Sequence, residues 1–139
     1  MSAAAAARVV GQVGLGAALL WAGTLHLTSA RKAFRAQVPS WLPADPDAVV
    51  LVSGGVELGL GGALLLAWPQ PARAVTGLTT AAFFVGIFPG NIAQLVERRN
   101  AFGLDTDAKR AARLLFQPLL VAWALAATDA RAALPSGRN

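Results

Sequence analysis

Apolar residues are gathered into four long segments along the chain, with short polar stretches between them. The segments cover residues 9–27, 49–68, 74–96 and 111–128. A helix of about 20 apolar residues spans the hydrocarbon core of a bilayer. Glu57 is the only Asp, Glu, Lys or Arg in the first three segments, so these helices lack the wet face of a soluble bundle. The pattern predicts an all-α fold, a transmembrane antiparallel four-helix bundle in which residues 1–139 form a single domain.

The polar connections predict how the helices are joined and oriented. Residues 28–48 and 97–110 are long polar loops, whereas residues 69–73 are short enough to make the second and third helices antiparallel neighbours. The two long loops, with Arg113, carry eight of the 12 Lys and Arg residues. The positive-inside rule therefore predicts a multi-pass protein of the cell membrane with its long loops in the cytoplasm. The tail after Asp129 is expected to be a frayed end.

Small residues at four-residue spacing predict how the helices pack, because close packing drives helix association in lipid. The predicted ridges are Gly14, Ala18 and Ala22 in the first segment, Gly55, Gly59 and Ala63 in the second, and Gly86 and Gly90 in the third.

The composition excludes several kinds of site. There is no Cys and only one His, so disulfides, thiolate metal sites and a haem held by two histidines of this chain are excluded. No motif encodes a cofactor and no metal site is predicted. The net charge of +5 arises at the ends of the apolar segments. Anionic lipid headgroups explain that placement, and the bilayer rather than nucleic acid is the expected partner.

Six polar residues are predicted to lie at one level, in the half of the bilayer next to the long loops, and form the candidate ligand-binding set. They are His26, Glu57, Asn91, Gln94, Arg113 and Gln117. Because successive helices run in opposite directions, all six fall near the same surface. Glu57 lies about 12 Å along its helix from that surface.

Glu57 is the most informative of the six, because an ionised carboxylate near mid-membrane costs several kcal/mol, about 3 on insertion scales. It is therefore protonated, paired or hydrated. One interpretation is structural, a neutral Glu57 bonded to Asn91 across the bundle. The other is a binding or proton-handling site in which His26, whose ring titrates near neutrality, is the partner. His26 and Glu57 are the candidate catalytic residues if the protein is an enzyme.

Pro89 interrupts the third segment next to this polar level. Its ring removes a backbone donor, which frees the carbonyl of Val85 and predicts a kink, and Gly90 loosens the turn further. Pro118 follows Gln117 in the fourth segment. Two prolines beside the polar level favour a cavity there.

Several of these residues belong to runs that resemble the DoxX-like family of small bacterial four-helix membrane proteins. The runs are VPSWLP at 38–43, SGGVELG at 53–59, FPGN at 88–91 and QPL at 117–119, together with His26. Gly90 stands where Ala is expected. Some members are subunits of quinol oxidase or thiosulfate:quinone oxidoreductase systems. The resemblance implies a bound quinone, a soluble or membrane redox protein as partner, and roles for His26, Glu57 and Asn91.

Four functions stay open. The first is a redox-associated accessory subunit that binds a quinone-like or other apolar small molecule at the polar level. The second is a membrane-embedded acid/base enzyme, of the isomerase type, that uses Glu57 and His26. A structural scaffold without ligand is the third, and a transporter ranks last because the polar level stops halfway across the bilayer. Assembly of the chain into a homo-oligomer also stays open.

Overall fold

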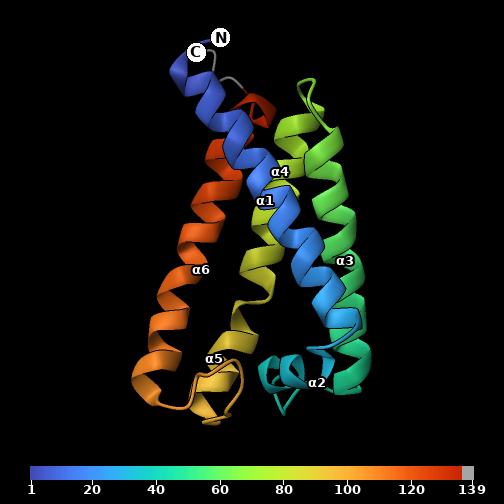
Figure 1. The fold of residues 1–139 in the computed structure, drawn as a ribbon, viewed down its shortest axis with the longest axis vertical. Coiled ribbons are helices and arrows are strands. Elements are labelled where there is room, and N and C mark those ends of the chain that lie inside the picture. The colour runs from blue at the N-terminus through green and yellow to red at the C-terminus, as the bar shows by residue number, and fades with distance from the viewer. Residues whose placement is uncertain (136–139) are drawn as a thin grey trace.

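Four long apolar helices form the framework of the protein (Figure 1). A computed structural model describes residues 1–135, in which every regular element is helical. Each of the four helices is long and apolar enough to cross a membrane, the third as a span over Ala72–Val96 that contains a break, and the all-α four-helix architecture is confirmed. The elements in chain order are α1 (Ala3–Leu27), α2 (Arg31–Phe34), η1 (Arg35–Gln37), α3 (Pro46–Leu66), α4 (Ala72–Gly86), α5 (Phe88–Val96), α6 (Asp107–Ala127) and η2 (Ala130–Ala133).

Three of the long helices begin at side chains that cap them. Ser2 accepts a hydrogen bond from the backbone of Ala5, and the alanine run behind it extends α1 well before residue 9. Asp45 caps α3 in the same way, ahead of a proline in its first turn. Thr106 caps α6, so this helix begins in the stretch that the hydrophobic pattern assigned to the loop.

The third apolar segment is broken into α4 and α5, as the proline predicts. The backbone N–H of Ile87 bonds to the carbonyl of Phe83, and that of Gly90 bonds to Ile87. The carbonyl of Phe84 accepts a side-chain hydrogen bond from Gln117 instead, at 2.8 Å. A polar side chain of α6 thus satisfies backbone that the break exposes, which is the condition for such breaks inside a membrane.

Glycines let α1 and α3 approach one another backbone to backbone. A Cβ added at Gly23 would lie 2.8 Å from the carbonyl oxygen of Gly54, and one added at Gly61 would lie 2.8 Å from that of Gly16. Real Cβ atoms do not approach backbone this closely, so both crossings need glycine. The four glycines are spaced by seven residues on each helix, and α1 packs mainly against α3.

The predicted ridges are therefore wrong for α3. Nothing lies within 4 Å of a Cβ built at Gly55 or Gly59, so that GxxxG pattern faces away from the rest of the chain. Ala18 and Ala22 of α1 and Gly86 of α4 line a cavity rather than a helix contact. On α3 the spacing of four selected the wrong face, because both sides of this apolar helix carry small residues. On α1, Gly14 does lie against α6, since a Cβ built there is 3.6 Å from the ring of Trp123.

A hydrogen-bonded polar cluster joins α1, α3, α4 and α6 at the end that carries the termini. Gln12 is fully buried and donates to the carbonyls of Leu64 and Ala67, at 2.7 and 3.0 Å. Arg73 donates to the side-chain oxygen of Gln12 and, at 2.8 Å, to the carbonyl of Ala127. The last carbonyls of α3 and α6 gain donors in this way.

Both long connections lie at the opposite end of the molecule (Figure 1). The short connection does make α3 and α4 antiparallel neighbours, although α4 packs mainly against α6. The core between the helices consists of Leu15, Leu19, Leu64, Ala81, Phe84 and Ala124. The expected frayed tail is wrong for Ala130–Ala133, which form η2 against α4 and α6 with Ala130 buried; residues 136–139 lie outside the described chain.

The glycine contact makes a prediction with its control one residue away. Gly61→Ala should destabilise the protein by about 1–3 kcal/mol, because its new methyl meets the backbone of α1. Gly62→Ala meets nothing within 4 Å and should be neutral or stabilising by up to about 1 kcal/mol. Thermal unfolding of both variants in the same detergent measures the difference, and equal melting temperatures would contradict the proposed contact.

Candidate functional site

His26 and Glu57 lie side by side in the interior, as the sequence predicts. His26 ends α1 and Glu57 lies in the middle of α3, with 8% and 5% of their surfaces exposed. Nδ1 of His26 lies 2.9 Å from Oε2 of Glu57 and 2.8 Å from the carbonyl oxygen of Ala22. Only the approach to Ala22 has the direction of a hydrogen bond. Oε2 of Glu57 is therefore buried with no hydrogen-bond partner in residues 1–135.

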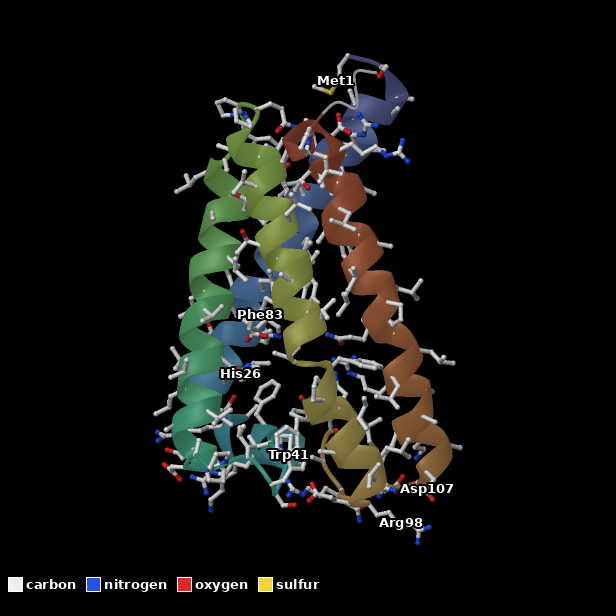
Figure 2. The ribbon with its side chains drawn as sticks, turned by 180° about the vertical axis from the view of Figure 1, so that it is seen from behind. Met1, His26, Trp41, Phe83, Arg98 and Asp107 are labelled. Atoms are coloured by element: carbon white, nitrogen blue, oxygen red, sulfur yellow. The ribbon has the colours of Figure 1, made fainter. Side chains whose placement is uncertain are left out.

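A cavity of about 530 Å³ adjoins this pair, between α1 and α3 on one side and α4, α5 and α6 on the other. Its walls are mostly apolar and include the rings of Phe83 and Phe84. His26, Glu57 and Arg113 are the charged or titratable residues among its lining, and Arg113 comes from α6. In Figure 2, His26, Phe83 and Trp41 lie between α3 and the α4–α5 segment. The volume suits a small ligand with an apolar body.

Asn91, Arg113 and Gln117 form a second polar group in the same half of the bundle. The side-chain oxygen of Gln117 accepts from Nδ2 of Asn91 at 3.3 Å and from Arg113 at 3.1 Å. Because Gln117 also donates to the carbonyl of Phe84, the orientation of its amide is fixed. Asn91 must then turn its nitrogen to Gln117, and its buried oxygen has no partner in the described residues.

Gln94 does not join either group. It is buried, with 1% of its surface exposed, and bonds to Gln37 at 3.2 Å and to the backbone of residues 99 and 101. These partners belong to the two long connections, so Gln94 holds loops together. Of the six predicted residues, the structure brings His26, Glu57 and Arg113 to the cavity and places Asn91 and Gln117 beside it.

The first long connection folds inward and covers the cavity. Phe34 stacks on the His26 ring with 3.3 Å between centroids. A Cβ at Gly90 would collide with the carbonyl of Gln37, so glycine lets this connection touch α5. This contact requires glycine at position 90. Trp41 also lines the cavity, although 70% of its surface is exposed.

Cations of the two long connections hold the first connection in place over the cavity. Arg31 and Arg35 both bond to Asp47 at the start of α3, and the hydrogen bond raises the pKa of the Arg31 guanidinium. Arg99 donates to the carbonyl of Val38, which is buried. From the sequence, these cations were expected to contact lipid headgroups and to orient the protein, whereas in the structure they hydrogen-bond to α3 and to the first long connection.

Several cavity residues were missed by the sequence interpretation. Ser53 lies four residues before Glu57, on the same helical face, and this spacing could have identified it. Phe34, Gln37 and Trp41 reach the cavity only because their connection turns inward. Local spacing carries no signal for such a turn.

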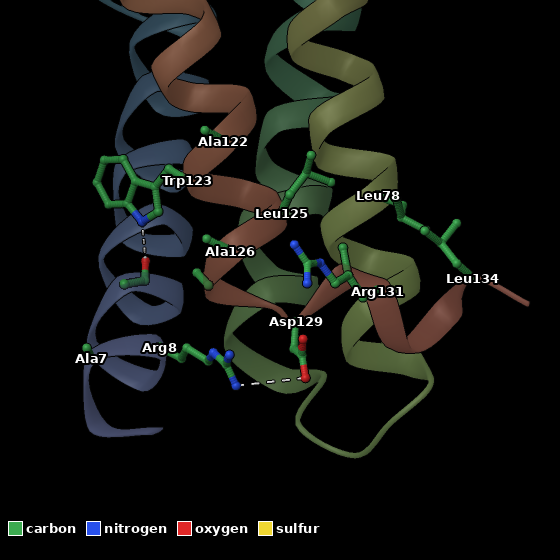
Figure 3. Close-up of a pocket in the computed structure, with 13 residues that line it drawn as sticks. Ala7, Arg8, Leu78, Ala122, Trp123, Leu125, Ala126, Asp129, Arg131 and Leu134 are labelled. Carbon is green, nitrogen blue, oxygen red and sulfur yellow. Dashed lines mark hydrogen bonds and ion pairs between the residues drawn. The ribbon is translucent and has the colours of Figure 1, made fainter. Parts of the chain in front are cut away.

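A larger hollow of about 760 Å³ lies at the end with the termini (Figure 3). None of the six predicted residues lines it, and alanine and leucine form most of its surface. Its carboxylate, Asp129, lies 3.8 Å from Arg8, and Trp123 donates to the carbonyl of Gly11. We therefore take the cavity beside His26 and Glu57 as the candidate site.

Comparison with known proteins gives a family and no activity. Residues 15–128 match the model of a family described as a domain of unknown function (DUF8561), and the chain belongs to this family. The match covers α1 from Leu15 onward, the other long helices in full, and every candidate residue. No curated protein and no solved structure matches the chain.

The contact of the first long connection with Gly90 of α5 can be tested by mutation. Gly90→Ala should push the connection off α5, because the new methyl meets the carbonyl of Gln37. Trypsin cleavage at Arg31, Lys32 or Arg35 should then accelerate roughly five- to tenfold, the effect of about 1 kcal/mol or slightly more of overpacking. Gly86→Ala is the control, since nothing lies within 4 Å of its Cβ. Equal cleavage rates in the two variants would show that the connection is not seated on Gly90.

Proposed function

We propose that the protein is a redox-associated accessory subunit of the membrane that binds a quinone-like or other apolar small molecule in the cavity beside His26 and Glu57. The observation that carries the proposal is the buried Oε2 of Glu57, which has no hydrogen-bond partner in the described residues, on a residue that lines a mostly apolar cavity of about 530 Å³. Buried polar atoms are normally bonded, so an orphan of this kind favours a ligand.

The residues present fit a quinone-like head group. Apolar walls suit the ring and tail, Arg113 can donate to an oxygen of the head group, and His26 and Glu57 can bond to another. When bound, a quinone supplies electron-transfer chemistry, which the side chains of this cavity do not provide. The DoxX-like runs of the sequence support the redox association, a bacterial source and a redox protein as partner. Under this proposal the two long connections face the cytoplasm.

Photolabelling tests the binding proposal. A decyl-tailed benzoquinone that carries an azide should label wild-type protein in detergent on peptides from the cavity wall. Ala18→Trp places a large ring on the cavity lining and should reduce labelling roughly tenfold or more, because the new side chain takes the space of the ligand.

The control for this experiment is Ala17→Trp, which adds the same ring at an exposed neighbour that does not line the cavity. Labelling should stay at the wild-type level there. Equal labelling of wild type and Ala18→Trp would exclude the cavity as the binding site.

A second candidate function is acid/base catalysis by His26 and Glu57. It is favoured by the burial of these two titratable side chains beside one cavity, where Nδ1 of His26 and Oε2 of Glu57 lie 2.9 Å apart. Purified protein should then convert a lipid-like substrate in a pH-dependent manner, and His26→Ala should abolish the conversion. Purified protein that is inert toward such substrates between pH 5 and 9 would count against this candidate.

A further inference from the structure

The hydrogen-bonding direction of His26 is set by its own helix. Nδ1 lies 2.8 Å from the carbonyl oxygen of Ala22, and a carbonyl can only accept. Nδ1 therefore carries a hydrogen, and when the ring is neutral this leaves the lone pair on Nε2. No residue in 1–135 donates a hydrogen bond to Nε2, although the ring lines the cavity.

Glu57 adds a second acceptor beside this one. Its Oε2 lies 2.9 Å from the protonated Nδ1 of His26, whose N–H points to Ala22. A hydrogen on Oε2 would be pressed against that N–H, so Oε2 keeps its lone pairs free whether the carboxyl group is ionised or neutral. With a neutral His26 ring, Nε2 and the buried Oε2 of Glu57 are therefore two neighbouring acceptors without a donor in the described residues, on two residues that line the cavity.

The other residues around His26 and Glu57 further restrict the class of ligand that fits the cavity. Phe34 covers one face of the His26 ring, which leaves the edge with Nε2 for a ligand. Arg113 lines the same cavity and disfavours a cationic ligand, whereas Glu57 disfavours an anionic one. A neutral donor is the class that fits both, and the aromatic and aliphatic walls suit a ring with an alkyl tail.

We infer that the cavity selects neutral ring head groups that donate a hydrogen bond, of the phenol class, over matched head groups that only accept. The inference rests on the proposed binding function and specifies its ligand. For a quinone-like molecule it selects the hydroxyl-bearing form. The polar cluster at the other end of the bundle has no such unpaired acceptor on Gln12, because the side chain of Gln12 bonds through both its amide nitrogen and its oxygen.

A matched pair of probes tests this inference. 4-Nonylphenol and its methyl ether, 4-nonylanisole, differ in the donor hydrogen and one methyl group. Each compound competes with the azido-benzoquinone for binding to wild-type protein in detergent. The concentration of each compound in the micelles is measured directly. The phenol should compete at about tenfold lower concentration than the ether, the size expected for one ordinary hydrogen bond.

Variants assign the preference to the two acceptors. Glu57→Met and His26→Phe each remove one acceptor and should reduce the phenol preference toward equality. Val56→Met introduces the same side chain one residue away, at a position that is 41% exposed and does not line the cavity, and should keep the full preference.

The outcomes separate the two proposals. Equal competition by phenol and ether in wild type overturns the donor preference while the binding function stands. A probe that fails to label the cavity, with no competition by either compound, overturns both. If the phenol preference is retained in both Glu57→Met and His26→Phe, other atoms accept the hydrogen bond from the hydroxyl group. That result overturns the assignment to these two acceptors.

Discussion

The close approach of α1 and α3 is the constraint on which the candidate site depends. Glycines bring the two backbones together at Gly16 with Gly61 and at Gly23 with Gly54. The second crossing also presses α3 against the Cβ of His26. The buried imidazole and the carboxylate of Glu57 therefore meet because two helices touch backbone to backbone. Side chains at these crossings would separate the helices and the pair with them.

The two ends of the bundle treat buried polar atoms differently. Near the termini, Gln12 and Arg73 bond to one another and to the last carbonyls of α3 and α6, which ties the helices together. Beside the cavity, acceptors on Glu57 and Asn91 have no partner in the described residues. A buried polar atom without a partner destabilises a fold. The hydrogen-bonded end near the termini therefore stabilises the bundle, whereas the end beside the cavity has the properties of a binding site.

The break in the third apolar segment shows what local sequence can predict about a helix and what it cannot. Pro89 predicts the interruption, since its ring removes a backbone donor. The residue that compensates for the break, Gln117, lies far along the chain and was identified only as a polar residue at the same level. Its partner turned out to be the carbonyl of Phe84, whereas proline geometry pointed to Val85. A proline fixes where a helix is weakened, but the neighbouring helix decides how the freed backbone is satisfied.

The number of helices, their approximate limits, the break and the common level of the polar residues followed from the sequence, because apolar length and chain direction determine them. Which face of each helix meets another helix did not follow. In lipid both faces of a helix are apolar, so periodicity carries no inward signal, and Gly55 and Gly59 could not be told from Gly54 and Gly61. The inward fold of the first long connection and the direction of each hydrogen bond around His26 depend on atoms far apart in sequence. Only their tertiary arrangement decided them.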